Sequence, residues 1–587
     1  MNTRFFSLVL SLLVFSIMFV QLATSPQSGD GAEQVLTALK GGVLHPPGFP
    51  FQAWINRLFV LLPFENEVWR LSLLSLIAHS AAVGFLADAI WLLTGSIISA
   101  GVGALSFAFF PTIWYLAVQP EVFSLTHLTM VLVLWWSIVL LNDGKKSNPA
   151  LMAAITGVLC AVCLSQHTLA VIFLPFVVVS VLSISSESNS NSVWILFSVV
   201  FCLVIFSFYA SLPLLRTDSV WPDFGKLSSV RDVLGHALRI QYGVFSLEAN
   251  TSDSATRGIR FFLPEVLKSL NLILPFFLIG LFSFIKEPLS QRLHQGLALS
   301  FLLSLIFLIR AKVGGISEAA EAVLERFYGP AIICFAIYIG YGFERALKKY
   351  GNKLIPGVAA IFVILSLYQG WSRANAASDN VADVFREGLR VNLPQNAIYL
   401  SHSDLEALYG ISGPAGTMRF PIEQGLASLP WYKQQVVPVI DPRIGFDAAA
   451  TLMVPGIIAA AYKDKYAVVT TCSDILPAQY KRELRGLYFY VHPTVNDLYN
   501  DETVKAAVAL CPVIAKLRPL PNKGHLYSKQ LWKGFWRAYA GAATYLASVK
   551  GSENSYKAAQ SVAEGLLKGK NAQSWVSGCK KLEKSLK

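Results

Sequence analysis

Long apolar runs separated by short polar segments fill the first 371 residues of the chain. The hydrocarbon core of a membrane is about 30 Å thick, so a helix needs roughly 20 mostly apolar residues to cross it. Runs of that length predict eleven membrane spans, at residues 5–22, 69–93, 97–117, 122–141, 149–166, 168–184, 192–215, 266–286, 290–310, 327–345 and 354–371. Gln166 and His167 interrupt one apolar stretch, so the fifth and sixth spans have a single broken helix as their alternative.

The first span has a second interpretation. Arg4 followed by the apolar run Phe5–Val20 is also typical of a signal peptide. The candidate cleavage site at Ala23–Ser25 is followed directly by Pro26, which processing tolerates poorly. We therefore expect an uncleaved anchor.

After Trp371 the pattern changes to shorter apolar bursts between polar residues. These predict one amphipathic helix, four short strands and a helical hairpin, at Asp379–Val391; Ala397–Leu400, Val436–Ile440, Tyr466–Thr471 and Tyr488–Val491; and Tyr527–Leu567. The alternation of helices and strands favours a soluble α/β layer. The predicted fold is thus a polytopic α-helical membrane protein, residues 1–371, with a C-terminal soluble α/β domain, residues 372–587, that ends in helices.

The composition agrees with a membrane protein. Of 587 residues, 54% are hydrophobic and only 14% are charged, whereas soluble domains carry about 25% charged residues. The net charge of +12 comes from 48 basic and 36 acidic residues. The basic residues flank apolar runs or lie in the Lys-rich tail Lys550–Lys587, which favours a topological role over nucleic-acid binding.

The short loops predict the orientation. With eleven spans, all basic clusters fall on one side, namely Arg4, Lys145–Lys146, Lys286 with Arg292, and Arg345, Lys348, Lys349 and Lys353. The positive-inside rule makes that side cytoplasmic. Residues 23–68, 216–265, 311–326 and the C-terminal domain then face outward. We expect a bacterial inner-membrane protein with a cytoplasmic N-terminus and a periplasmic C-terminal domain.

The first outer segment holds the most informative polar residues. Asp30 and Glu33 are three apart, so both carboxylates share one face of a helical turn. The run His45–Pro50 follows, with three prolines that fix φ and Gly48 that permits a turn. The alternatives are a helix N-cap for Asp30 and, for the turn, a rigid entry to the amphipathic stretch Phe51–Phe64 along the membrane surface.

These motifs resemble one family. Asp-x-x-Glu, followed about a dozen residues later by Leu-x-His-Pro-Pro-Gly-[Phe/Tyr]-Pro, is similar to the protein O-mannosyltransferase-like branch of the GT-C membrane glycosyltransferases. Further similar elements follow in order, at Trp69–Ser75, Trp114 with Glu121–Leu125, Leu164–Leu169, Glu325–Pro330, and Leu393–Ile398 with Asp404. The likeness covers residues 1 to about 410. Gly31–Ala32 departs from the Ser-Gly expected between the acids but leaves both carboxylates in place.

The resemblance implies an inverting transferase that uses a polyprenyl-phosphate-linked sugar on the outer side of the membrane. The expected reaction moves mannose or another hexose to a Ser/Thr hydroxyl of an exported protein. The resemblance implies Asp30 as the general base that takes the proton of the hydroxyl, with Glu33 in support. Beyond the lipid-linked donor we expect no cofactor. GT-C enzymes include metal-dependent members, and one Asp-x-x-Glu assigns no metal.

Candidate substrate-binding residues lie on the other outer segments. The leaving phosphate needs positive charge, and Arg216 and Arg326 stand at the outer ends of spans. The alternative for each is an arginine that snorkels to the interface. His45 and Glu121 are candidates for binding the sugar or orienting the acceptor.

The outer segment 216–265 offers Trp221, Asp223 and Tyr242. Aromatic faces with a nearby acid form a sugar platform, and interfacial aromatic residues also serve as ordinary membrane anchors. His167 lies at the possible helix break, and the sequence favours neither a functional role nor a packing role for it.

Cysteine spacing adds little. Cys160 and Cys163 lie inside an apolar span, which favours helix packing over a redox or metal motif. Cys472 and Cys511 form a candidate outer disulfide that leaves Cys579 unpaired, a pairing that the sequence leaves open.

Three alternatives to protein glycosylation stay open. The first keeps the same donor and changes the acceptor to a glycolipid or envelope polysaccharide. A secondary transporter is a different class, against which stand the scarcity of acids inside the spans and the lack of paired broken helices in the sequence. A non-catalytic envelope scaffold is the third.

Overall fold

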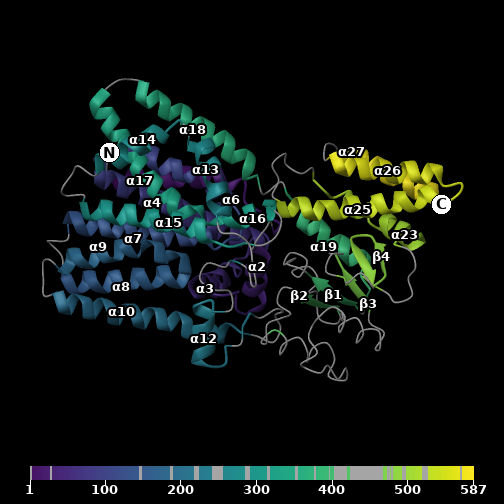
Figure 1. Ribbon diagram of the computed structural model, residues 1–587, viewed down its shortest axis with the longest axis horizontal. Coiled ribbons are helices and arrows are strands. Elements are labelled where there is room, and N and C mark those ends of the chain that lie inside the picture. Colours follow the sequence, from purple (N-terminus) through teal and green to yellow (C-terminus); the bar gives the residue numbers. More distant parts are fainter. Residues whose placement is uncertain are drawn as a thin grey trace. The chain divides into compact units, whose positions relative to one another are not determined.

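The computed structural model describes the chain except for residues 1–2, 27–29, 144–147, 186–189, 217–223, 226, 241–246, 248–255, 271, 285–290, 314–316, 351–353, 376–378, 395–396, 402–418, 424–431, 433–466, 472–475, 477–479, 492–497, 519–525, 569–571 and 587. The chain forms two compact units (Figure 1). The membrane unit comprises Met1–Ala23 and Thr37–Ala376, and the second unit comprises Thr24–Leu36 and Ala377–Lys587.

The membrane unit is helical. Its helices are α1 (Thr3–Phe19), α3 (Pro50–Phe59), α4 (Glu67–Thr94), α5 (Ile97–Ala108), α6 (Pro111–Ala117), α7 (Phe123–Asp143), α8 (Pro149–Gln166), η2 (Thr168–Phe173), α9 (Leu174–Ser185), α10 (Ser190–Ala210), α11 (Leu212–Leu215), α12 (Val230–Ala237), α13 (Arg257–Leu270), α14 (Leu274–Phe284), α15 (Gln291–Arg310), α16 (Ser317–Leu324), η4 (Glu325–Tyr328), α17 (Gly329–Tyr350) and α18 (Leu354–Arg373). Helix α2 (Gly31–Lys40) joins the two units. Among the described residues, eight helical segments are long and apolar enough to cross a membrane, or up to ten if each of two bent pairs is one span. The predicted integral membrane fold is confirmed.

Two predicted spans are bent. Residues 97–117 form α5 and α6, which meet at an angle of 72°. Pro111 begins α6, and a proline there disfavours helical geometry in the preceding residue. The predicted span at 266–286 combines the end of α13 with α14, and the two helices meet at an angle of 103°. Helix α13 is strongly amphipathic and carries Arg260 and Lys268.

Gln166 ends α8, and the chain reverses at His167. The backbone of His167 is extended (φ −161°, ψ 135°), and its Nδ1 accepts a hydrogen bond from the N–H of Leu169 at 2.9 Å. This cap begins a new helical segment, η2 with α9, which packs back on α8. The prediction of two spans here, instead of one broken helix, is confirmed.

Burial distinguishes inner from lipid-facing helices. The stretch Gly329–Phe343 of α17 is buried throughout, because α4, α5, α14 and α15 pack around it. Helix α10 packs on α8 with one face (Figure 1) and leaves large apolar side chains exposed on the other, with Leu203 at 62% and Phe206 at 66%. Such a face is suited to lipid contact.

The second unit contains a five-stranded sheet in the order β2-β1-β3-β5-β4. The strands are β1 (Ala397–Ser401), β2 (Arg419–Glu423), β3 (Ala467–Thr470), β4 (Arg482–Arg485) and β5 (Tyr488–Val491). Strand β1 runs parallel to β2 and β3, and β5 runs antiparallel to β3 and β4. The strands predicted near 397, 467 and 488 are confirmed, whereas the one predicted at 436–440 lies outside the described residues.

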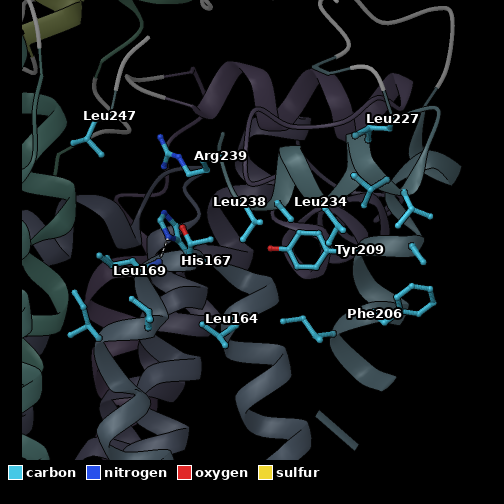
Figure 2. Close-up of a pocket in the computed structure, with 18 of the residues that line it drawn as sticks. Leu164, His167, Leu169, Phe206, Tyr209, Leu227, Leu234, Leu238, Arg239 and Leu247 are labelled. Atoms are coloured by element: carbon cyan, nitrogen blue, oxygen red, sulfur yellow. Dashed lines mark hydrogen bonds between the residues drawn. The ribbon is translucent and has the colours of Figure 1, made fainter. Parts of the chain in front are cut away.

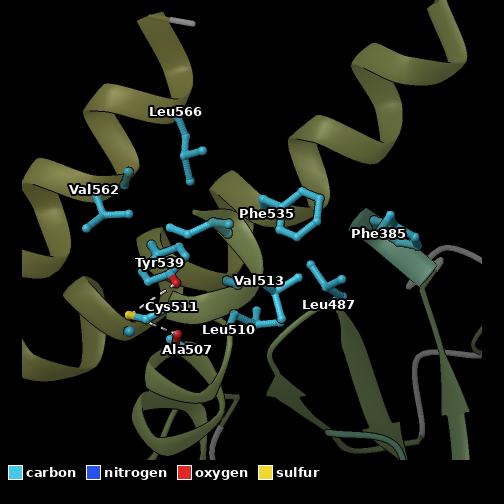
Figure 3. Packing of buried hydrophobic residues seen from close by; sticks show 14 of the residues in the cluster. Phe385, Leu487, Ala507, Leu510, Cys511, Val513, Phe535, Tyr539, Val562 and Leu566 are labelled. Carbon is cyan, nitrogen blue, oxygen red and sulfur yellow. Dashed lines mark hydrogen bonds between the residues drawn. The ribbon is translucent and has the colours of Figure 1, made fainter. Parts of the chain in front are cut away.

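Helices pack on this sheet and on one another. They are α19 (Val381–Asn392), α23 (Asp501–Ala509), α24 (Cys511–Ile514), α25 (Leu526–Ser548), α26 (Glu553–Lys568) and α27 (Ala572–Leu586). Helices α25 and α26 confirm the predicted hairpin. Phe385, Leu487, Phe535, Val562 and Leu566 meet in the core between helices and sheet (Figure 3).

A disulfide joins Cys511 at the start of α24 to Cys579 in α27, with Cα atoms 5.7 Å apart. The predicted pairing of Cys472 with Cys511, which left Cys579 unpaired, is therefore wrong. Cys511 and Cys579 are brought together because α24 packs on α27. The hydroxyl of Tyr539 lies 3.6 and 3.5 Å from the two sulfur atoms (Figure 3).

Candidate active site

The two carboxylates of the Asp-x-x-Glu motif lie at the start of α2. Asp30 directly precedes the helix, and its carbonyl oxygen accepts from the N–H of Gln34 at 2.9 Å. Asp30 is half-buried, whereas Glu33 in the first turn is only 4% exposed. Both side chains lie at the helix N-terminus, where the helix dipole attracts negative charge. Both residues belong to the second unit, and their proposed catalytic roles stay a prediction.

The His-Pro-Pro-Gly segment forms a tight turn in the membrane unit. The N–H of Gly48 donates to the carbonyl oxygen of His45 at 2.8 Å, and Gly48 has a φ of 87°. Pro50 then begins α3. The ring of His45 lies edge-on to Phe49 and Phe224, with centroids 5.1 and 6.1 Å away. The turn thus fixes the imidazole between two aromatic rings.

A second histidine anchors this turn. The Nε2 of His236, on α12, donates to the carbonyl oxygen of Leu44 at 3.0 Å. Gly48 and Gly225 leave room for the ring, because a Cβ on either would lie 3.0 Å or less from it. Burial lowers the pKa of His236 to about 4, with His45 adding to the effect and the Leu44 hydrogen bond opposing it. Sequence reasoning missed His236, since no local motif surrounds it.

The structure brings two of the predicted residues together. The Arg326 guanidinium, in η4, lies 3.8 Å from a carboxylate oxygen of Glu121, which is 1% exposed. The Ser75 hydroxyl lies 3.4 Å from both the backbone N–H and the carbonyl oxygen of Glu121. Glu121 is therefore a buried carboxylate held against a cation.

The residue before Arg326 extends this ion-pair network. The Arg373 guanidinium, at the end of α18, pairs with Glu325 and lies 3.1 Å from Glu265 of α13. The network thus ties η4 to the last turn of the last membrane helix. Arg373 and Glu265 were missed, although a charged residue at the end of an apolar run is a signal that could have singled them out.

Buried amides tie the turn helix to the span break. Gln166 donates from Nε2 to the side-chain oxygen of Gln52 at 2.9 Å and to the carbonyl oxygen of Val122 at 3.1 Å. Gln52 in turn donates to Asn56 at 2.8 Å. Because Val122 follows Glu121, this network fixes α3 and α8 around the buried carboxylate.

An apolar cavity of about 980 Å³ opens beside this network. It is lined mainly by residues of α8, η2, α10, α12, α15 and η4, most of which are apolar. Three of its polar lining residues stand out: His167, Tyr209 and Arg239. Figure 2 shows His167 and Arg239 among the side chains that line the cavity and the Tyr209 hydroxyl directed toward its interior. Arg239 follows α12 with a φ of 53°, a left-handed conformation that is rare outside glycine.

Of the remaining predicted residues, the structure describes Arg216 but not the aromatic candidates and Asp223. Arg216 is exposed at the end of α11. Trp221, Asp223 and Tyr242 lie outside the described residues.

The fold has a known counterpart. The crystal structure of ArnT from Cupriavidus metallidurans bound to undecaprenyl phosphate matches with a TM-score of 0.57 at 12% identity, covering 84% of this chain and 98% of that one. The apo structure of ArnT matches with a TM-score of 0.55 at 13% identity, over 82% and 97% of the two chains. At this identity the likeness shows the fold alone, and that fold is the GT-C architecture.

The sequence relatives are more specific. Residues 30–191 match the family model described as the protein O-mannosyl-transferase TMEM260 N-terminal domain. The chain is 26% identical over 420 residues to protein O-mannosyl-transferase TMEM260 of Mus musculus. The aligned region covers 67% of this chain and 58% of that protein. It is 29% identical over 238 residues to protein O-mannosyl-transferase tmem260 of Dictyostelium discoideum, over 38% and 29% of the two proteins. The resemblance predicted from the motifs is confirmed.

Proposed function

We propose that this chain is a membrane glycosyltransferase that moves a hexose, mannose in the first instance, from a polyprenyl-phosphate donor to a Ser/Thr hydroxyl of a protein. The observation that carries the proposal is the cavity of about 980 Å³, with apolar walls and the cation Arg239 among its lining residues. Support comes from the relatives named protein O-mannosyl-transferases and from ArnT, whose crystal structure holds undecaprenyl phosphate.

The cavity suits an isoprenoid phosphate. Its apolar walls offer contact to a hydrocarbon chain, whose burial is favourable by about 25 cal/mol per Å². The exposed apolar face of α10 beside the cavity gives a lipid a route from the bilayer. Arg239 supplies the forked donor that binds phosphate oxygens and stabilises the charge of the leaving group.

The chemistry needs a base. In the proposed reaction Asp30 takes the proton of the acceptor hydroxyl while its oxygen forms a bond to the anomeric carbon of the sugar. The bond from that carbon to the phosphate oxygen breaks, and the polyprenyl phosphate leaves with the electron pair, which inverts the anomeric centre. Glu33, more deeply buried, positions the first turn of α2. The reaction uses the donor and no further cofactor.

The sugar is assigned to the groups around Glu121. Its buried carboxylate is an acceptor for sugar hydroxyls, and the Arg326 guanidinium lies 3.8 Å from one of its oxygens. His45, fixed between Phe49 and Phe224, is the second proposed sugar contact.

The disulfide supports the predicted sidedness. Disulfides persist mainly in oxidising compartments, so the Cys511–Cys579 bridge favours a second unit outside the cytoplasm. The basic residues Lys348 and Lys349 end α17, whereas η4 with Arg326 precedes its first turn. We therefore assign the Arg326 end to the outer side and the N-terminus to the cytoplasm. Both sequence relatives above are eukaryotic, so nothing in the comparisons supports the predicted bacterial inner membrane.

The test is transfer by the purified full-length chain in lipid nanodiscs. Polyprenyl-phosphate mannose with a labelled sugar is supplied together with a Ser/Thr-containing protein domain, in parallel with the glucose donor, a glycolipid acceptor and an EDTA arm. Label on the protein supports the proposal. Label on the glycolipid alone would show that the acceptor is a glycolipid and not a protein. Binding of the donor without transfer to either acceptor contradicts the enzyme assignment and favours the scaffold alternative.

A further inference from the structure

A second cavity, of about 770 Å³, lies between α1, α4 and α7, on the membrane unit but away from the candidate active site. We call it the α1–α4 groove. It is lined by apolar residues and by six polar or amphipathic ones: Arg4, Ser7, Ser11, Ser80, Asp88 and Trp135. None of these belongs to the machinery proposed above.

The polar residues of α4 form one stripe. Ser80, Gly84 and Asp88 are spaced by four residues, so they share one face of the helix. Gly84 allows α1 to come close, because a Cβ there would clash with the Ser11 hydroxyl. The two helices run antiparallel, with Arg4 and Asp88 lining the same groove.

Asp88 is a half-buried carboxylate inside a predicted span. One of its oxygens accepts a hydrogen bond from the Trp135 indole at 2.8 Å. An ionised acid in a membrane helix is energetically costly, and such residues are functional-site candidates by default. Because a positive partner offsets that cost, we expect one at the depth of Asp88. The Trp135 bond holds the carboxylate in place without neutralising it.

Ser80 points to a ligand independently. It is 4% exposed, it lines the groove, and its hydroxyl has no hydrogen-bond partner among the described residues. A buried hydroxyl without a partner is destabilising by more than a typical hydrogen bond contributes. A bound molecule with an acceptor oxygen at this level satisfies it.

We propose that the α1–α4 groove binds one phospholipid with a phosphoethanolamine headgroup. The ammonium group donates to Asp88, and the phosphate pairs with Arg4. Ser80 lies two helical turns, about 12 Å, further along α4, and donates to an ester carbonyl oxygen. The acyl chains then lie along Leu8 and Leu12, which are exposed on α1.

Charge complementarity selects this lipid. A phosphoglycerol headgroup offers no cation and places its negative charge near Asp88. A choline headgroup carries the positive charge but has no N–H to donate to the carboxylate. Only the ethanolamine lipid matches both the acid and the base, and charge-assisted hydrogen bonds are about twice as strong as neutral ones.

The test is lipid binding to the delipidated full-length protein in detergent, measured by native mass spectrometry. Phosphatidylethanolamine, phosphatidylcholine and phosphatidylglycerol with identical acyl chains are titrated separately. We expect the ethanolamine lipid to bind about tenfold more tightly than the other two. Asp88→Asn removes the charge but keeps an oxygen for Trp135, and it should abolish that preference.

Two further variants make the result specific. Ser80→Ala should lower the binding affinity for all three lipids by a similar factor, because it removes the hydroxyl that donates to the ester group they share. Ser207→Ala is the matched control, since Ser207 is exposed on α10, bonds within its own helix and lines neither cavity described here. It should bind like the wild type.

Equal affinity for the three lipids in the wild type overturns the proposal. So does an unchanged ethanolamine preference in Asp88→Asn. A lipid-free dimer that dissociates in Asp88→Asn would also overturn it, because the occupant would then be a helix of a second copy.

Discussion

The Nε2 of His236 donates a hydrogen bond to the carbonyl oxygen of Leu44 at 3.0 Å, across 192 residues of sequence. This bond attaches α12 to the His-Pro-Pro-Gly turn. The same helix leads into Arg239, which lines the cavity. The turn that fixes His45 and the proposed phosphate-binding residue are therefore held by one element.

His236 makes this element sensitive to acid. Its folded pKa of about 4 lies below the ordinary value of 6.5, because the ring is buried. The contribution of the neutral ring to the free energy of unfolding is fully present above pH 6.5. As the pH falls toward 4, the free energy of unfolding decreases by up to about 3 kcal/mol, because the unfolded chain binds the proton more readily. His236→Gln keeps a donor for Leu44 but does not titrate.

We therefore expect the unfolding temperature of the wild type to exceed that of His236→Gln at pH 7.5. The difference should shrink as the pH falls from 6.5 to 4.5, measured by thermal unfolding in detergent. A difference that does not change with pH would contradict the assigned role of His236.

Arg326 is expected to stabilise the membrane unit through Glu121. Arg326→Met leaves a buried carboxylate without this cation, which destabilises by about 3 to 5 kcal/mol. The double variant with Glu121→Gln should recover part of that loss, because no buried charge remains. Thermal unfolding of the single and double variants measures the coupling, and additive losses would rule out the ion pair as the cause.

Filling the cavity should block the donor. Leu234 lines the cavity from α12, so Leu234→Trp places bulk where the isoprenoid chain is proposed to lie. We expect the apparent KM for the polyprenyl-phosphate sugar to rise at least tenfold while the fold is kept. Leu203→Trp is the control, because Leu203 is exposed on α10 and is not among the residues that line the cavity. Equal KM values in the two variants would exclude the cavity as the lipid site.

The disulfide should stabilise the second unit. Cys511 and Cys579 are separated by 68 residues, and closing a loop of that length contributes on the order of 4 kcal/mol. Cys579→Ser, or a reductant, should lower the unfolding temperature of this unit. Cys202→Ser, at an exposed free cysteine, should leave it unchanged. Equal effects of the two variants would indicate that the bridge does not form.

The membrane fold was largely predictable because spans are local. An apolar run of sufficient length specifies a helix by itself, as in the stretches that became α4 and α7. At 266–286 the apolar run continues from the apolar face of α13 into α14, so run length alone did not predict the bend of 103° between them. The strong amphipathicity of α13, with Arg260 and Lys268, distinguishes the two.

The sequence suggests candidate site residues mainly where a motif is contiguous. Asp30, Glu33 and His45 stand in one short segment of sequence. His236 and Arg239 lie almost 200 residues away, and only the packing of α12 brings His236 to the turn and Arg239 to the cavity. The disulfide partners were also not predictable, because the spacing of the cysteines does not show that Cys511 and Cys579 meet in the fold.

The most direct measurement of the central claim is transfer of labelled mannose from polyprenyl phosphate by Asp30→Asn. Loss of a general base lowers kcat by about 10² to 10⁴, so we predict a loss of that size with little change in the KM for the donor. Glu65→Gln, which alters an exposed acid of the same outer segment, should transfer at the wild-type rate. Full transfer by a folded Asp30→Asn protein would contradict the account.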